Sequence, residues 1–200
     1  MDYRRPARSH SIELEIRKSR FIADIQPVHD RDDAMRFIES VRALHPKANH
    51  HCWAYVAGAP DDAHQWNCSD DGEPKGTAGQ PMLNVLRHSH LGNLCAVTTR
   101  YFGGIKLGTG GLARAYSQSV QDALNELPTE AVIATVAIRL TAPYTLTGEL
   151  EHLINLFQLS QCERTFGENF TLTAKLEAHR QQAFEEALIP FQHQITLHIS

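Results

Sequence analysis

A cluster of glycines constrains this chain more than any other feature of its sequence. The segment RYFGGIKLGTGGLARAY, residues 100–116, places five of the chain's twelve glycines in the nine positions from Gly103 to Gly111. Glycine inside a strand or helix costs stability, so such a cluster indicates a backbone that must bend or be approached closely. The β-branched stretch LCAVTTRYF (94–102) precedes it, and apolar residues recur at helical spacing as far as Pro128. The sequence therefore predicts a strand, a glycine-rich turn and a helix.

This order of elements favours the binding of an anion. The first N–H groups of a helix have no partner within the helix, and a glycine-rich turn lets a phosphate approach them. A second segment, SDDGEPKGTAGQP (69–81), has a similar order, with Thr77 predicted as the N-cap of a helix. The candidate phosphate-binding residues of the two segments are Arg100, Tyr101, Gly103, Gly104, Lys106, Gly108, Gly110, Gly111, Arg114, Gly76, Thr77 and Gly79.

Neither segment carries a known nucleotide-binding fingerprint. There is no GxGxxG motif with an acidic residue about twenty positions later, and Thr109 stands where a P-loop would need lysine. A different interpretation, in which the glycines only allow a strand and a helix to pack closely, therefore stays open.

Composition and charge bound the class of protein. The net charge is −4, which argues against a strongly basic domain that binds duplexes without specificity. The N-terminus does not resemble a signal peptide, and no apolar run approaches the eighteen or so residues of a membrane span. The four cysteines form no CxxC pair, and Cys52 and Cys95 lie in apolar runs that predict burial. We therefore expect a cytoplasmic protein that does not insert into a membrane.

The pattern of elements predicts an α+β chain with two domains, residues 1–128 and 129–200, divided at Pro128. In the first, strands are expected within 11–28, 52–58, 64–70 and 94–102, and helices over 30–46, 77–90 and the segment before Pro128. In the second, strands over 131–142, 162–167, 170–178 and 194–199 alternate with helices over 145–158 and 180–188. This βαββαβ order is that of the ferredoxin-like fold.

Two long segments carry a family resemblance. SDDGEPKGTAGQPML (69–83) followed by VTTRYFGGIKLGTGGLARAYS (97–117) closely resembles the hallmark segments of the IMPACT/YigZ family, and HHCWAY (50–55) resembles its His-x-Cys-x-Ala stretch. The resemblance covers about residues 11–125, and the remainder is similar to the extra C-terminal domain of bacterial members. Lys75 departs from the pattern, since such proteins usually have a small residue there.

The resemblance implies both fold and function. It implies an N-terminal fold like the second domain of a small-subunit ribosomal protein and domain IV of elongation factor G. The ferredoxin-like C-terminal domain would be similar to domain V of elongation factor G. Because these folds occur together on the ribosome, the resemblance implies a translation-related regulator whose partners are RNA, the ribosome or translation factors. In this interpretation Trp53, Tyr55 or Phe102 would stack on bases, unless Trp53 and Tyr55 fill the core.

An enzyme acting on a phosphorylated small molecule or nucleotide is the main alternative. Asp70, Asp71 and Glu73 would hold Mg²⁺, and His51 would act as general base. The competing interpretation of these acids is a solvated turn.

Two weaker alternatives remain. One is a zinc site from His50, His51, Cys52, Cys68 and His64, although their spacing matches no zinc pattern. The other is a nucleophile, either Ser69, which lacks a GxSxG elbow, or Cys52 or Cys68. The sequence predicts no defined metal site, and nothing in it demands catalysis.

Overall fold

The computed structural model describes residues 2–200, which form two compact units. One comprises residues 3–132 (the N-terminal unit), and the other comprises Asp2 with residues 133–200 (the C-terminal unit). The predicted mixture of helices and antiparallel sheets is confirmed. None of the helices in the described part of the chain is long and apolar enough to span a membrane.

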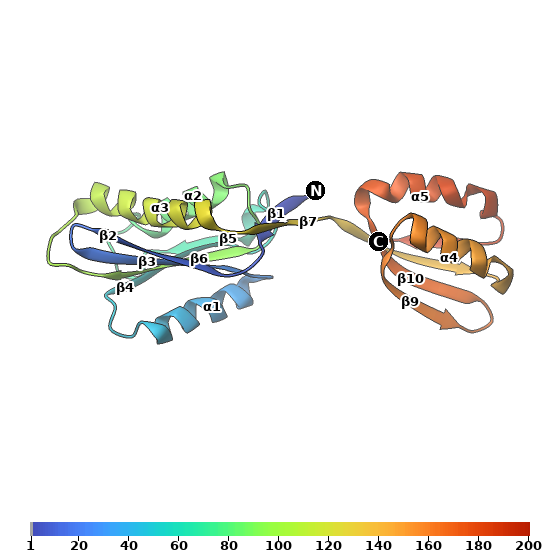
Figure 1. The fold of residues 1–200 in the computed structure, drawn as a ribbon, viewed down its shortest axis with the longest axis horizontal. Coiled ribbons are helices and arrows are strands. Elements are labelled where there is room, and N and C mark those ends of the chain that lie inside the picture. The colour runs from blue at the N-terminus through green and yellow to red at the C-terminus, as the bar shows by residue number, and fades with distance from the viewer. Residues whose placement is uncertain (1) are drawn as a thin grey trace. The chain divides into compact units, whose positions relative to one another are not determined.

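The N-terminal unit is a five-stranded antiparallel sheet with helices on both faces (Figure 1). The strands run in the order β2-β3-β6-β4-β5. Helices α2 and α3 cover one face and α1 covers the other (Figure 1). The strands are β2 (His10–Ile16), β3 (Ser19–Pro27), β4 (His50–Val56), β5 (Trp66–Ser69) and β6 (Leu94–Tyr101). The helices are α1 (Arg31–Leu44), α2 (Gly79–His88) and α3 (Gly108–Glu126), with a 3₁₀ turn at Ala63–Gln65.

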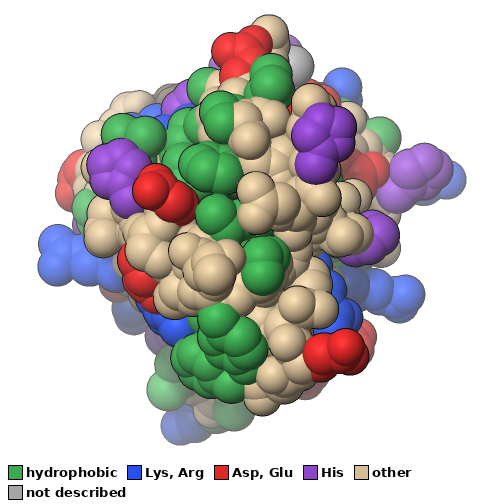
Figure 2. Space-filling model, turned by 90° about the vertical axis from the view of Figure 1, so that its right-hand side faces the viewer, with side chains coloured by type: hydrophobic (Ala, Val, Ile, Leu, Met, Phe, Trp, Pro, Cys, Tyr) green, Lys and Arg blue, Asp and Glu red, His purple; other side chains and the backbone are tan. Residues whose placement is uncertain are grey.

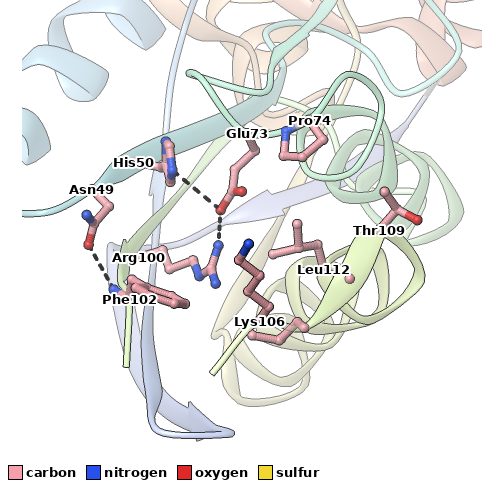
Figure 3. Close-up of a pocket in the computed structure, with 11 residues that line it drawn as sticks. Asn49, His50, Glu73, Pro74, Arg100, Phe102, Lys106, Thr109 and Leu112 are labelled. Carbon is pink, nitrogen blue, oxygen red and sulfur yellow. Dashed lines mark hydrogen bonds and ion pairs between the residues drawn. The ribbon is translucent and has the colours of Figure 1, made fainter. Parts of the chain in front are cut away.

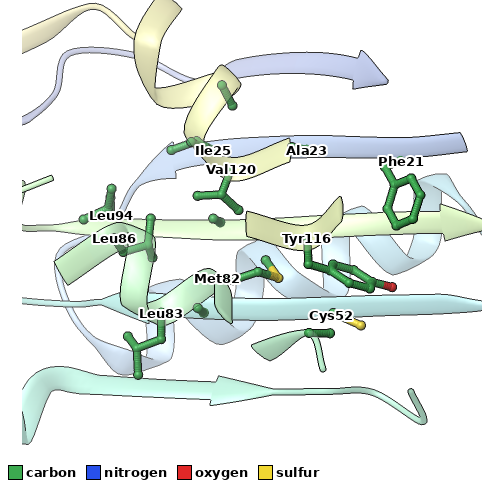
Figure 4. Close-up of a cluster of buried hydrophobic side chains, with 14 of the residues drawn as sticks. Phe21, Ala23, Ile25, Cys52, Met82, Leu83, Leu86, Leu94, Tyr116 and Val120 are labelled. Carbon is green, nitrogen blue, oxygen red and sulfur yellow. The ribbon is translucent and has the colours of Figure 1, made fainter. Parts of the chain in front are cut away.

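The central strand β6 is buried on both faces, as its β-branched composition predicts. Its alternate residues Leu94 and Ala96 pack under α2 and α3, whereas Cys95 and Val97 pack against α1. The sheet therefore has a hydrophobic core on each face. Figure 4 shows the larger one, under α2 and α3, in which Tyr116 of α3 lies against Phe21 of β3 at one end. Because side chains alternate across the sheet, each residue of β4 and β6 is assigned to one face by its position.

The boundary between the units lies four residues later than the predicted Pro128. Strand β7 (Thr129–Val132) pairs with β1 (Tyr3–Pro6), so it belongs to the N-terminal unit. The single strand predicted over 131–142 is correspondingly wrong, because β8 begins only at Thr135. The alternation of apolar residues continues across this break, so the sequence pattern does not reveal the change of pairing partner.

The C-terminal unit has the predicted βαββαβ order of elements. Its antiparallel sheet runs β11-β8-β10-β9, and its core gathers Ile138 and Leu140 of β8 with Phe170 of β10 and Phe184 of α5. Its strands are β8 (Thr135–Ala142), β9 (Ser160–Phe166), β10 (Phe170–Glu177) and β11 (Thr196–Ile199), and its helices are α4 (Thr147–Leu156) and α5 (Gln181–Leu188). Single 3₁₀ turns lie at Tyr144–Leu146, Ala178–Arg180 and Ile189–Phe191.

One face of the molecule is drawn in Figure 2. Hydrophobic side chains reach its surface among uncharged polar groups, while lysine and arginine side chains lie toward the margins of the view. Basic charge is thus spread around this face rather than gathered at its centre.

Candidate anion-binding site

A pocket of about 420 Å³ lies beside the end of β6 and the beginning of α3 (the Arg100 pocket; Figure 3). This volume falls in the range of small-ligand sites. The lining residues come from three segments that are distant in the sequence: Asn49, His50, Glu73, Pro74, Arg100, Phe102, Lys106, Leu107, Gly108, Thr109 and Leu112. Three of the predicted phosphate-binding residues meet here, Arg100, Lys106 and Gly108, together with Glu73 of the predicted acidic set.

A buried ion pair forms one wall of the Arg100 pocket. Arg100 Nη1 lies 2.5 Å from Glu73 Oε1, and the two residues are only 5% and 8% exposed. The hydroxyl of Tyr116 donates to the same oxygen at 2.9 Å, and His50 Nε2 lies 3.9 Å from it. Burial, followed by its contacts with Cys52 and Glu73, raises the pKa of Tyr116, which keeps the proton available for this bond. Since buried charges are stable only when paired, Glu73 holds Arg100 in place.

Arg100 nevertheless retains an unused donor. Its Nε is buried and has no hydrogen-bond partner within the described residues. In Figure 3 its guanidinium lies between Phe102 and Lys106, on the side of the pocket. A buried N–H without an acceptor is costly, so an oxygen-bearing ligand that reached this donor would stabilise it.

The N-terminus of α3 forms the opposite wall. The helix begins at Gly108, and no side chain of the described residues caps its first turn. Gly104 and Gly108 have φ values of +86° and +72°, which other residues rarely adopt, and a Cβ on either would meet nothing within 4 Å. The exposed Lys106 extends toward the pocket in Figure 3. The helix dipole and the ammonium group together make this wall electropositive.

The packing interpretation holds for other glycines of the two segments. A Cβ on Gly103 would overlap the carbonyl oxygen of Lys18, and one on Gly79 would lie 2.7 Å from the backbone of Ser69. By contrast, the nearest atom to a Cβ on Gly110 is Arg114 Nη1, at 3.8 Å. The glycine cluster therefore serves close packing at Gly103 and backbone conformation at Gly104 and Gly108.

The N-terminus of α2 is capped by the protein itself. Asp70 accepts hydrogen bonds from the N–H groups of Gly76, Ala78 and Gly79 at 2.7, 3.0 and 2.9 Å. Burial acts to raise the pKa of Asp70, but these three bonds outweigh it and hold the pKa below its usual value. The prediction that Thr77 caps this helix is wrong, because its hydroxyl donates to Pro74 O at 2.7 Å. The amides predicted to bind phosphate here already bind a carboxylate.

Two predicted site residues lie on the opposite face of the sheet. His50 and Arg100 are cross-strand partners on the α2–α3 face, so the next residues, His51 and Tyr101, point toward α1. There His51 Nε2 lies 3.1 Å from His45 O, and the Tyr101 hydroxyl lies 3.0 Å from His45 Nδ1. Burial lowers the pKa of His51. The histidine of the Arg100 pocket is thus His50 and not the predicted His51.

The acidic residues predicted to hold Mg²⁺ turn toward separate partners. Asp71 bonds to Arg42 Nη2 at 2.7 Å and to the N–H of His51 at 2.6 Å, while Asp70 caps α2 and Glu73 pairs with Arg100. Among residues 2–200, no three or more acidic, histidine or cysteine side chains gather in a way that would hold a metal ion. The donors predicted for magnesium and for zinc therefore do not converge.

The buried cysteine and aromatic side chains fill the core. Cys52 is fully buried, and burial raises the pKa of its thiol, which disfavours the nucleophilic thiolate. Tyr55 is 4% exposed and stacks on Trp53 with ring centres 5.7 Å apart. Phe102, in contrast, is 47% exposed at the Arg100 pocket.

Residues 17–124 match the Impact N-terminal domain. The chain belongs to this family. The resemblance read from residues 69–83 and 97–117 is thereby confirmed. An IMPACT family member of Haemophilus influenzae is 41% identical over 187 residues, which cover 94% of this chain and 91% of that protein. The IMPACT family member YigZ of Escherichia coli is 47% identical over 158 residues, or 79% and 75% of the two chains.

A solved structure is similar over the whole chain. A crystal structure described as that of a hypothetical protein is 39% identical, with a TM-score of 0.75 over 99% of this chain and 96% of that one. Every residue that lines the Arg100 pocket lies within the segment matched by the IMPACT family. The likeness to domains IV and V of elongation factor G stays a prediction.

Arg114 lines a different pocket from the other predicted cations, Arg100 and Lys106. This pocket, of about 280 Å³, is lined by Ile16, Arg17, Leu107, Gly111, Arg114, Ala115 and Gln118 (the Arg114 pocket). Leu107 lines both pockets. No local sequence pattern points to Arg17, because its position beside α3 depends on how the β2–β3 turn packs.

Proposed function

We propose that this protein binds a phosphate-bearing ligand in the Arg100 pocket, and that the ligand is RNA or another component of the translation machinery. One observation carries the proposal: the uncapped first turn of α3 faces a pocket that also holds Lys106 and the unpartnered Nε of Arg100. The connection to translation rests on membership of the IMPACT family and on what the resemblance implies.

The charge balance of the site supports an anionic ligand. The charge of Arg100 is already compensated by Glu73, so Lys106 and the helix dipole supply the unbalanced positive potential. A phosphate group would satisfy the first-turn N–H groups of α3 in the way that Asp70 satisfies those of α2. The protein thus holds an internal example of the contact that we propose for the ligand.

Binding of labelled RNA and of nucleoside monophosphates, measured by fluorescence anisotropy, tests this proposal. Lys106→Ala should weaken binding about tenfold, the typical effect of losing one hydrogen bond to a charged group. Arg36→Gln is the matched control, because Arg36 lies on α1, on the other face of the sheet, with a side chain that is 70% exposed. Equal affinities of Lys106→Ala and the control, or no binding of any phosphate ligand, would contradict the proposal.

The volume of the Arg100 pocket favours a second candidate, an enzyme that acts on a phosphorylated small molecule or nucleotide. Turnover of such a compound that is lost in Lys106→Ala, with no affinity for RNA, would favour this candidate over the first.

A further inference from the structure

The Arg100 pocket and the Arg114 pocket adjoin each other at the start of α3. Leu107, the residue before the helix, lines both. The exposed Lys106 lies in the first pocket, and the exposed side chains of Arg17 and Arg114 lie in the second. A ligand that leaves one pocket across Leu107 therefore meets a second cationic site at once.

The glycine turn brings Arg17 to this position. The N–H of Gly103 donates to Ser19 Oγ at 3.2 Å, and the missing side chain of Gly103 leaves room for the backbone of Lys18. The β2–β3 turn, in which Arg17 and Lys18 both have positive φ, is thereby held against the glycine turn. The contact of Gly103 with Lys18 and Ser19 therefore packs the two turns together and also places Arg17 beside α3.

The Arg100 pocket also offers an aromatic surface. Phe102 is 47% exposed, and one side of its ring faces the guanidinium of Arg100 at 5.6 Å. An exposed aromatic ring beside positive charge is the usual platform for an unpaired base in proteins that bind single strands. A small phosphorylated metabolite would need the first pocket only, whereas a polynucleotide presents a flat base and repeated phosphates together.

We propose that single-stranded nucleic acid crosses the first turn of α3, with one base against Phe102 in the Arg100 pocket and a neighbouring phosphate on Arg17 and Arg114. This proposal rests on the proposed function, because it uses the same pocket for the first nucleotide. It adds a path, a minimum length of two nucleotides, and two residues that a mononucleotide would not touch. The buried Nε of Arg100, which lacks a partner among the described residues, marks the pocket as a ligand site independently of the helix N-terminus.

Anisotropy titrations with uridine oligonucleotides of one, two, four and eight units test the path. The double variant Arg17→Gln/Arg114→Gln should bind the tetranucleotide about tenfold or more weakly than wild type, while uridine monophosphate binding stays unchanged. The slope of log affinity against log salt should fall by about 0.7, the value for one lost phosphate contact on a single strand. Phe102→Leu should weaken both ligands by about fivefold to a hundredfold. Arg36→Gln is the control, and thermal unfolding of each variant checks its fold.

The outcomes separate this proposal from the broader one. Unchanged tetranucleotide binding by the double variant, or equal affinity for one and four units, overturns the path while an effect of Lys106→Ala still supports the site. Preference for a duplex over a single strand also overturns the path. Failure of every nucleotide and RNA to bind overturns both. Parallel titrations with deoxyuridine oligonucleotides show whether the 2′-hydroxyl contributes.

Discussion

The carboxylate of Glu73 and the guanidinium of Arg100 form a buried pair, 2.5 Å apart, at the wall of the candidate site. Glu73 follows β5 in the loop before α2, and Arg100 lies near the end of β6, so the pair joins two segments on either side of α2. It therefore serves the fold and the site together, and its removal should affect both.

Breaking this pair should be strongly destabilising. Glu73→Leu leaves the charge of Arg100 buried without a partner, and Arg100→Met leaves the charge of Glu73 buried without a partner. Each single variant should lower the free energy of unfolding by about 3–5 kcal/mol. The double variant should cost less than either single variant, because no buried charge remains. Urea unfolding of the four proteins measures this, and a double variant whose loss equals the sum of the two single losses would contradict it.

Two glycines of the cluster should respond in opposite ways. Gly103→Ala places a methyl group on the carbonyl of Lys18 and should cost about 1–3 kcal/mol, because backbone must move. Gly110→Ala, in the first turn of α3, meets nothing closer than 3.8 Å and should leave stability equal or raised by up to about 1 kcal/mol. Thermal unfolding of both variants tests this contrast, and equal losses would show that the packing at Gly103 has been misread.

The Asp70 cap should contribute to stability above the acid range. Asp70→Ala removes the acceptor of three N–H groups and should cost about 1–2 kcal/mol near neutral pH. Because the folded pKa lies below the ordinary value of 3.8, the unfolded chain binds the proton first as pH falls. The contribution is complete above about pH 5 and is lost as the pH drops through the folded pKa.

Unfolding free energies between pH 7 and pH 2 test this dependence. The difference between wild type and Asp70→Ala should shrink toward acid pH, whereas Asp61→Ala, at an exposed position in the turn before β5, should show little difference throughout. A difference that is constant over the whole range would mean that the charge of Asp70 is not involved.

The unit boundary predicts how the chain can be shortened. A fragment of residues 1–132 should fold cooperatively, because it keeps the pairing of β1 with β7. A fragment of residues 1–128 loses that strand and the bonds of Arg4 to Thr129, and it should be less stable by at least about 1 kcal/mol. Circular dichroism melts compare the two, and identical melting temperatures would place the functional boundary at Pro128 after all.

Buried and half-buried thiols should differ in reactivity. Cys52 and Cys95 are fully buried, and burial raises the pKa of each thiol, so iodoacetamide at pH 8 should modify them only after unfolding. Cys162 is only half-buried and should react in the native protein. Mass spectrometry of peptides after timed labelling checks the order, and early modification of Cys52 would show that its strand opens readily.

The sequence by itself determined the elements and the family. Alternation and helical spacing are local properties, so they placed β2, the buried strand β6, α3 and the βαββαβ order of the second half. The hallmark segments at residues 69–83 and 97–117 likewise identified the IMPACT family without any coordinates. The single strand predicted over 131–142, by contrast, is wrong, because the chain leaves one sheet after Val132 and enters another at Thr135 while the apolar alternation continues.

Only the tertiary structure decided what the charged residues do. Glu73 and Arg100 are 27 positions apart, and nothing local pairs them. Lys106 precedes α3, whereas Arg114 lies within it on another side, so the rotation of the helix sends these cations into different pockets. The loop after β5 folds back on α2, so the carboxylate of Asp70 binds the first amides of that helix and leaves none of them for a ligand. Contacts between side chains that are distant in the sequence depend on how the whole chain packs, and a short stretch of sequence does not contain that information.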